Sequence, residues 1–130
     1  MKCPVCKKTM IILEYEDIEL DYCPRCKGTW LDAGELELLL FGELRSSATI
    51  DPSTLVHGKR VCPRCKKRMR IGYFPGTRVE VDVCPVDRGI WLDQGELLEI
   101  AKSHAESATL REVSQFFRGV FGAQLEQKEK

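Results

Sequence analysis

No apolar run in this 130-residue chain is long enough to span a bilayer, and neither sign of charge dominates, because 20 Lys and Arg balance 20 Asp and Glu. A dedicated nucleic-acid binder typically has a strong excess of basic residues, and this chain as a whole lacks one. The opening Met1-Lys2-Cys3 shows no secretory signal, so we expect a cytoplasmic protein with reduced cysteines. The chain also lacks an eighth cysteine, and the odd count of seven disfavours a disulfide framework.

The cysteines that are present fall into pairs separated by two residues. The stretch from Cys23 to Leu36 recurs 61 residues later, from Cys84 to Leu97, with 9 of 14 positions identical. An earlier pair precedes each copy, which gives two four-ligand sets, C-x2-C-x16-C-x2-C and C-x2-C-x18-C-x2-D. Such spacing is typical of a structural zinc site. The predicted ligands of two zinc ions per chain are Cys3, Cys6, Cys23, Cys26, Cys62, Cys65, Cys84 and Asp87.

Asp87 makes the second set different, since it stands where the first set has Cys26. A carboxylate oxygen is an acceptable zinc ligand but binds less tightly than a thiolate, so we expect the second site to be the weaker one. Exchange of the aspartate for water would turn this site into a catalytic form. An enzyme that uses this zinc or its thiolates is therefore the alternative to a structural role, but the sequence identifies no general base or substrate pocket, and we expect no enzyme.

Between the cysteine pairs of each unit the sequence predicts a β-hairpin. The expected strands are 9–15 and 18–22 in the first unit and 68–74 and 77–83 in the second. After the second pair, Asp32 and Glu35 fit a capping box, in which Asp32 accepts the Glu35 N–H and Glu35 reaches back; Asp93 and Glu96 repeat it. The two helices are expected to run to about Phe41, before Gly42, and to about His104. Capping explains these acidic pairs better than acid–base chemistry, and we assign Trp30 and Trp91 to the core.

The segments CPVCKKTM and DYCPRCKGTWLDAGELE resemble the zinc ribbon of the transcription-factor-IIB type. The pattern of that family, C-P-x-C…C-P-x-C-x-G-x-W-L-D-x-G-E-L, is met in full at 3–36, and the copy at 62–97 departs from it at Asp87. The resemblance implies zinc and a role near nucleic acid or transcription. It implies no reaction.

The predicted fold class is a small metal-stabilised α+β protein of two tandem zinc ribbons, each a β-hairpin with a capped helix, and an extra C-terminal amphipathic helix. Units of about 45 residues bury too little core to fold without their metal. We assign 1–44 and 61–105 to the ribbons, 45–60 to a linker, 106–123 to the amphipathic helix and 124–130 to a polar tail. The apolar helices are expected to meet within one chain or across a homodimer.

Charge is unevenly distributed along the chain, since residues 1–58 hold 6 basic and 10 acidic residues and residues 59–130 hold 14 and 10. A basic run around the third cysteine pair is the candidate for phosphate contact: Lys59, Arg60, Arg64, Lys66, Lys67, Arg68 and Arg70. Alternatively, these side chains form a solvated face that nearby acids such as Glu80 and Asp82 balance. The expected partners are a nucleic acid or a transcription or translation protein, with a purely structural protein–protein module left open and no membrane association.

Overall fold

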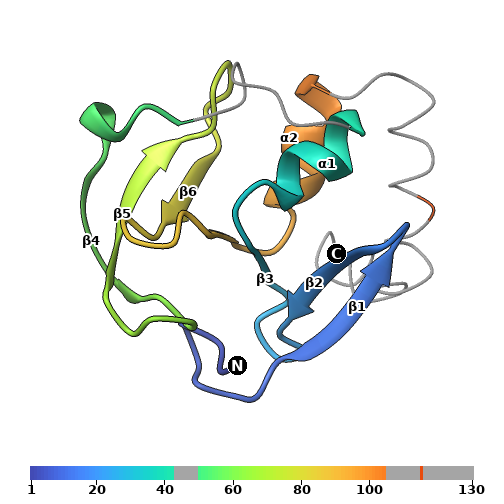
Figure 1. Cartoon of the computed structure of the whole chain (residues 1–130), viewed down its shortest axis with the longest axis horizontal. Coiled ribbons are helices and arrows are strands. Elements are labelled where there is room, and N and C mark those ends of the chain that lie inside the picture. The colour runs from blue at the N-terminus through green and yellow to red at the C-terminus, as the bar shows by residue number, and fades with distance from the viewer. Residues whose placement is uncertain (43–49, 105–114, 116–130) are drawn as a thin grey trace, which may run out of the picture.

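The structure is a computed structural model that describes residues 1–42, 50–104 and 115. In this part of the chain, seven strands form one antiparallel sheet in the order β1-β2-β3-β7-β6-β5-β4 (Figure 1). The strands are β1 Ile11–Tyr15, β2 Ile18–Tyr22, β3 Thr29–Leu31, β4 Val56–Val61, β5 Arg68–Tyr73, β6 Glu80–Val83 and β7 Ile90–Leu92. The helices are α1 Glu35–Phe41, α2 Glu96–His104 and a short 3-10 turn, η2 Pro52–Thr54.

Two of the strand pairs are the predicted hairpins. β1 pairs with β2 through a turn at Glu16 and Asp17, where both residues have positive φ angles of 46° and 68°. A turn with two left-handed central residues matches the natural twist of a two-stranded ribbon. β5 pairs with β6 through Pro75 and Gly76, and the Thr77 N–H donates to the Phe74 carbonyl at 3.0 Å. Both turns lie where the sequence predicts them.

The two short strands that follow the hairpins were not predicted. β3 pairs antiparallel with β7, and this pairing places Trp30 directly opposite Trp91. The strands of the two units are therefore arranged about the β3–β7 seam in mirrored order, and both units belong to one continuous sheet. Strands of three residues are too short to show an alternating apolar pattern, so the sequence marks them only as apolar cover.

Part of the expected linker also belongs to the sheet. Residues 56–60 were assigned to the linker from their composition, but they form most of β4, which pairs with β5 and has a register shift between His57 and Val61. An edge strand forms backbone hydrogen bonds to only one neighbour and does not require a regular apolar pattern. The sequence pattern therefore does not predict this strand. Before it, Asp51 caps η2 by accepting the Ser53 N–H at 3.0 Å.

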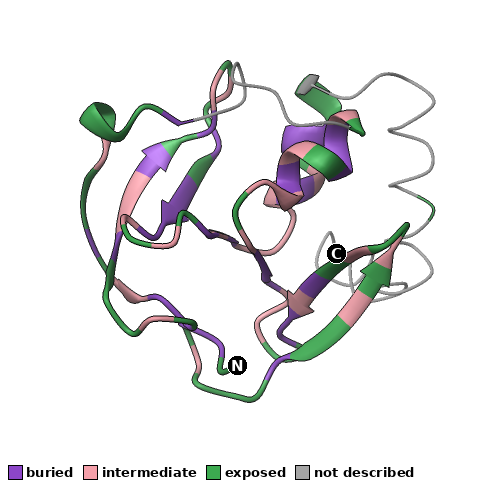
Figure 2. Ribbon diagram, viewed as in Figure 1, coloured by how far each residue is buried: buried purple, intermediate pink, exposed green. Residues whose placement is uncertain are grey.

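The sheet has a core on each face. Because alternate residues of a strand point to opposite faces, Leu31 and Leu92 lie on one side of the sheet and the intervening Trp30 and Trp91 on the other. The first core gathers side chains of both helices and both hairpins (Figure 2): Leu20, Leu31, Leu36, Leu39, Leu40, Phe74, Val81, Val83, Leu92, Leu97, Ile100 and Ala101 are among them. The second core packs the two tryptophans with Met10, Met69, Cys3, Cys23, Cys62 and Cys84.

The wide apolar surface of α1 is largely covered within the chain. Leu36, Leu39 and Leu40 are 1–3% exposed, and only Leu38 remains 39% exposed. The leucines of α1 share their core with Leu97 and Ile100 of α2. Residues 45–49 of the linker, almost all of the predicted helix 106–123 and the polar tail lie outside the described residues, where Gln115 alone is described and is exposed. No helix in the described part is long and apolar enough to cross a membrane.

The tryptophans explain a pair of glycines in the repeat. A Cβ atom added at Gly28 would lie 2.3 Å from Cζ2 of Trp91, and one added at Gly89 would lie 2.1 Å from Cζ2 of Trp30. Each unit therefore uses a glycine to admit the indole ring of the other unit. This reciprocal packing holds the two units together across the β3–β7 pairing.

We expect Gly89→Ala to lower the free energy of unfolding by about 1–3 kcal/mol, because the added methyl group overpacks a rigid aromatic contact. Trp30→Phe removes the ring atoms that the methyl would meet. Gly89→Ala should therefore cost less in a Trp30→Phe background than in the wild type, and chemical denaturation of the four zinc-loaded proteins measures the difference. Strictly additive effects would contradict the packing described here.

Candidate metal centres

Each predicted ligand pair sits in the same tight turn, and we number these cysteine turns one to four along the chain (3–6, 23–26, 62–65 and 84–87). In the first turn, the Lys7 N–H donates to the Cys3 carbonyl at 3.0 Å, and Lys7 has a φ of +68°. Lys27, Lys66 and Arg88 repeat both features in the other three turns, with distances of 2.8–3.0 Å and φ angles of 66–68°. The turn brings its two ligand side chains to one side of the backbone.

Backbone N–H groups point at the first sulfur of each turn. Cys3 Sγ accepts from Val5 and Cys6 at 3.3 and 3.5 Å, and Cys62 Sγ accepts from the two equivalent N–H groups at 3.4 Å each. Cys23 and Cys84 each accept from the N–H of the second ligand of their turn, at 3.2 and 3.5 Å. Hydrogen bonds of this kind stabilise a thiolate. Without metal, burial raises the pKa of the Cys26 and Cys62 thiols to about 12, so a zinc ion must displace their protons when it binds.

The four turns converge in two groups. One ligand atom from each of Cys3, Cys6, Cys23 and Cys26 lies within 4.8 Å of the others, and so does one from each of Cys62, Cys65, Cys84 and Asp87. In each set the first ligand of a turn is buried and the second is half-buried. All seven cysteines are free thiols. Four convergent donors, either four thiols or three thiols and a carboxylate, form a donor set of structural zinc, and the two sets fit two zinc ions.

Asp87 presents one carboxylate oxygen to the second ligand set. Its Oδ1 accepts the Gly89 N–H at 3.0 Å, while Oδ2 lies 3.2 Å from Cys62 Sγ. Burial works to raise the pKa of Asp87, but the Gly89 N–H and the neighbouring thiols outweigh burial and bring this pKa below its ordinary value. The carboxylate is therefore ionised, as a zinc ligand must be. The remaining oxygen, Oδ2, points into the site in place of the thiolate that Cys26 supplies in the first set.

The acidic pairs after the tryptophans have a different role from the one predicted. As expected, Glu35 Oε1 accepts the Asp32 N–H at 2.7 Å, and Glu96 Oε1 accepts the Asp93 N–H at 2.6 Å. The carboxylate of Asp32 does not cap the Glu35 N–H, which donates to the Asp32 backbone carbonyl at 3.0 Å. Half of each predicted capping box is thus wrong.

The aspartates instead accept the indole N–H groups of the tryptophans. Trp30 Nε1 donates to Asp32 and Trp91 Nε1 to Asp93, both at 3.1 Å. The helix begins one residue after a glycine, and Gly34 and Gly95 have φ angles of 85° and 86°, a conformation that other residues rarely adopt. The repeated W-L-D-x-G-E therefore fixes each tryptophan over the seam and then starts a helix.

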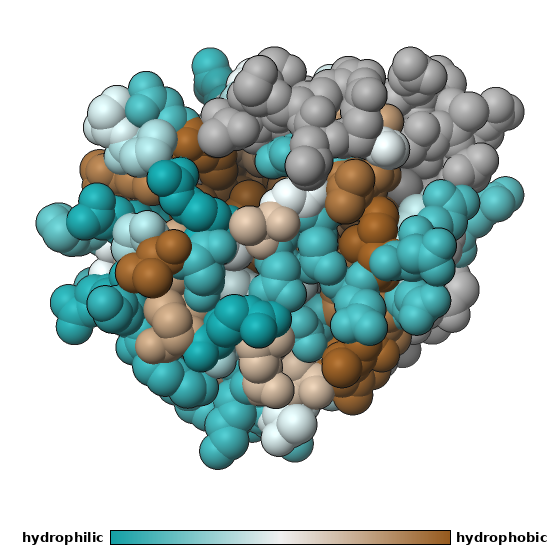
Figure 3. Space-filling model, viewed as in Figure 1, coloured by the Kyte–Doolittle hydropathy of each residue, from teal (hydrophilic) through white to brown (hydrophobic). Residues whose placement is uncertain are grey.

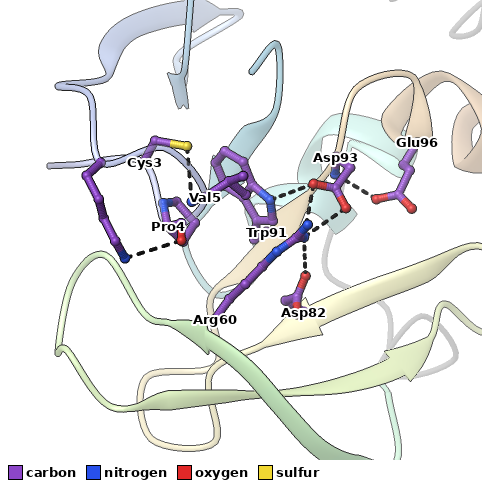
Figure 4. Close-up of polar contacts among 9 residues, drawn as sticks. Cys3, Pro4, Val5, Arg60, Asp82, Trp91, Asp93 and Glu96 are labelled. Carbon is purple, nitrogen blue, oxygen red and sulfur yellow. Dashed lines mark hydrogen bonds and ion pairs between the residues drawn. The ribbon is translucent and has the colours of Figure 1, made fainter. Parts of the chain in front are cut away.

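Two arginines of the basic run form ion pairs with carboxylates of the same chain. Arg60 Nη1 lies 3.0 Å from Asp82 Oδ2 and 2.8 Å from Asp93 Oδ2 (Figure 4). Asp82, which the sequence placed on the outer face of its strand, is instead buried. Arg64 of the second unit forms a two-point contact with Asp32 of the first unit at 2.9 and 2.7 Å. The first unit has Val5 at the position of Arg64, so only one of the two aspartates receives an arginine from the opposite unit.

The other members of the basic run remain at the surface. Lys59, Lys66, Lys67 and Arg68 are exposed and Arg70 is half-buried, and within the described residues none of the five takes part in an ion pair. His57 is exposed on β4 and belongs to neither ligand set. The predicted basic run is therefore divided: two of its cations stabilise the fold, and five face solvent.

Two hairpin units with one convergent four-ligand set each define this chain as a tandem zinc-ribbon protein. The family model described as transcription factor zinc-finger matches residues 2–41 and 61–103, which together make up more than half of the chain. The chain therefore belongs to the transcription factor zinc-finger family and contains two tandem copies of its ribbon. No curated protein and no solved structure matches the chain.

The two sites should differ in affinity because of Asp87. Native mass spectrometry should show two zinc ions per chain, and a chelator titration should remove one before the other. We expect Asp87→Cys to tighten the weaker site, since a thiolate donates more charge than a carboxylate, and Cys26→Asp to weaken the stronger one. If neither substitution changes zinc affinity, the ligand assignment is wrong.

Glu96 should make stability depend on pH. Burial raises the pKa of its carboxyl from an ordinary 4.5 to about 7, so the folded protein binds this proton more tightly than the unfolded chain does. The stabilisation is complete below the unfolded pKa and is lost as the pH rises through about 7. Relative to Glu96→Gln, the zinc-loaded wild type should lose unfolding free energy between pH 6 and pH 8 in chemical denaturation. Glu99→Gln, exposed on the same helix, is the control, and identical pH dependence in wild type and Glu96→Gln would contradict the assignment.

Proposed function

We propose that this protein is a non-enzymatic binding module whose two zinc ions hold a rigid surface for a nucleic acid. The observation that carries the proposal is the division of the cations. Arg60 and Arg64 form ion pairs with carboxylates of the same chain. A separate group of lysines around the first and third cysteine turns is exposed and, within the described residues, forms no ion pair. The family to which the chain belongs agrees with a role near transcription.

The zinc sites support a structural role for the metal. Each set offers four protein ligands within 4.8 Å of one another, and a site with four protein ligands leaves no coordination position for a reacting water. Glu96, whose pKa lies near neutrality, hydrogen-bonds the backbone of Asp93 and does not reach the ligand sets. An enzyme that acts through the Asp87 site thus lacks an identified base, and binding is the better proposal.

Metal binding also changes the charge that a partner meets. Seven thiolates and two divalent ions make the formally neutral chain about three charges negative once zinc is bound. Affinity for a nucleic acid must therefore come from a local concentration of cations. Trp30 and Trp91 are 0% exposed and cannot stack on bases, so we propose contacts to the phosphate backbone with little preference for sequence.

The proposed arrangement has one binding body, made of the ribbons 1–44 and 61–105 with the added strand β4, and residues 45–55 connect the two ribbons. The helix predicted at 106–123 would be an additional element of this body or of a homodimer. In the described part, the apolar residues that are most exposed lie at the outer strands: Ile12 is 65% exposed, and Val56 and Tyr73 are each 60% exposed. Figure 3 shows a hydrophobic patch over the region of β1. A protein partner would make its apolar contacts at these exposed positions.

The test measures the binding of labelled mixed-sequence oligonucleotides to the zinc-loaded full chain by fluorescence anisotropy. Affinity should fall steeply between about 50 and 200 mM salt, because each neutralised phosphate releases counterions. DNA and RNA of different sequences should bind within a few-fold of one another. No binding at the lowest salt concentration would refute the nucleic-acid function and leave protein interaction as the role of the module.

A further inference from the structure

A cavity of about 210 Å³ lies between the first and third cysteine turns. Four residues from each unit line it, at equivalent positions of the two repeats. Pro4 is equivalent to Pro63 and Lys7 to Lys66 in the repeat, and Lys2 adds a third cation to the lining. Figure 1 shows the N-terminal segment beside the turn that connects β4 to β5, although the two segments are about 60 residues apart in the sequence. The cavity therefore exists only because the sheet joins the two units.

The ammonium groups of the two facing lysines are directed by their own turns. Lys7 Nζ donates to the Pro4 carbonyl at 3.4 Å, and Lys66 Nζ donates to the Pro63 carbonyl at 3.1 Å. Both lysines have a φ of 68°, so their side chains leave the backbone in equivalent directions. No acidic side chain is among the residues that line this cavity. Three lysines line it together with the ligand residues Cys3 and Cys62, so its cations lie beside both metal centres.

Two more lysines extend this group of cations on either side. Lys8 follows Lys7 and Lys67 follows Lys66, and all of them are exposed. We call the five residues Lys2, Lys7, Lys8, Lys66 and Lys67 the lysine ridge. Within the described residues, none of them takes part in an ion pair. The ridge is therefore electrostatically available in a way that Arg60 and Arg64 are not.

Compensation of the zinc thiolates does not account for the ridge. Both turns of a unit contribute ligands to the same zinc ion, so a purely compensating role predicts similar numbers of cations around each. The first and third turns are followed by two lysines each, whereas the second and fourth are followed by one cation and then a glycine, Lys27-Gly28 and Arg88-Gly89. Arg25 lies inside the second turn and Arg64 inside the third, so the excess of the two turns that border the cavity comes from Lys8 and Lys67, at the positions where the other two turns have the glycines that face the indole rings.

We propose that the lysine ridge is the nucleic-acid contact of this protein, and that the cavity seats one backbone phosphate between Lys7, Lys66 and Lys2. Lys8 and Lys67 contact the phosphates on either side. This assignment rests on the proposed nucleic-acid function and names its site. The ridge differs from the basic run because it includes three lysines of the first unit and excludes Lys59 and all four arginines of the run. Recognition is of phosphodiester charge, since the aromatic residues next to the cavity are buried in the core.

The experiment measures the salt dependence of oligonucleotide binding for paired charge reversals in the full zinc-loaded chain. Lys7→Glu with Lys66→Glu should weaken binding on the order of tenfold or more and reduce the log–log salt slope by about 0.7 for single strands, the value for the one phosphate that the cavity seats. Because Lys7 and Lys66 hold a left-handed backbone, Lys8→Glu with Lys67→Glu is a second pair, and it should reduce the slope by about 1.4, the value for the two flanking phosphates. Mass spectrometry confirms that each variant keeps two zinc ions.

Two further pairs of charge reversals distinguish the lysine ridge from a general effect of net charge and from the basic run. Arg78→Glu with Lys102→Glu makes the same change in net charge at exposed positions away from the cysteine turns, and should leave the slope nearly unchanged.

Lys59→Glu with Arg68→Glu tests the basic run. If that pair abolishes binding while both ridge pairs bind as the wild type does, the ridge assignment is wrong and the nucleic-acid function stands. If the wild type itself does not bind, the function fails. Duplex and single-stranded probes show which form of backbone the ridge prefers.

Discussion

The antiparallel pairing of β3 with β7 is the interaction on which the rest of the structure depends. It joins two ribbons into one sheet, sets Trp30 opposite Trp91, and brings each indole ring against a glycine of the other unit. Without this seam, each ribbon would expose a tryptophan and one open strand edge, at a cost of about 25 cal/mol for every Å² of apolar surface. Within each unit, the bound metal stabilises the fold. The β3–β7 pairing then joins the two small metal-dependent units into one body with two cores.

The polar residues around the seam support it in an asymmetric way. The aspartate after each tryptophan binds the indole N–H, which fixes the ring, and then recruits an arginine. Asp32 recruits Arg64 across the units, whereas Asp93 shares Arg60 with the buried Asp82. Half-exposed pairs such as the first contribute about 0–1 kcal/mol, but a buried carboxylate that lost its arginine would destabilise the fold by several times more. Arg60 and Arg64 are thus held by carboxylates of the chain, whereas the lysines are among the cations that form no ion pair in the described residues.

Much of this structure could be predicted from the repeat. Cysteine spacing identified both ligand sets, Glu16-Asp17 and Pro75-Gly76 marked the hairpin turns, and Gly42 marked the end of α1, where its N–H donates to the Leu38 carbonyl. What could not be predicted is long-range pairing. β3 and β7 are too short to carry a pattern, and β4 follows its neighbour by backbone hydrogen bonds alone. The role of the aspartates was missed for a related reason: the local capping pattern is genuine for Glu35 and Glu96, but the indole and the arginine that compete for the aspartate side chain come from the tertiary structure.

The central claim is that both ribbons fold as one cooperative unit through the seam, and native-state hydrogen exchange of the zinc-loaded chain tests it most directly. The most protected amides of β1–β3 and of β5–β7 should exchange only through global unfolding and report the same free energy. Both groups should also lose protection equally in Gly89→Ala. Two different opening free energies, with one ribbon keeping its protection while the other exchanges, would show that the ribbons are independent domains and would contradict the account.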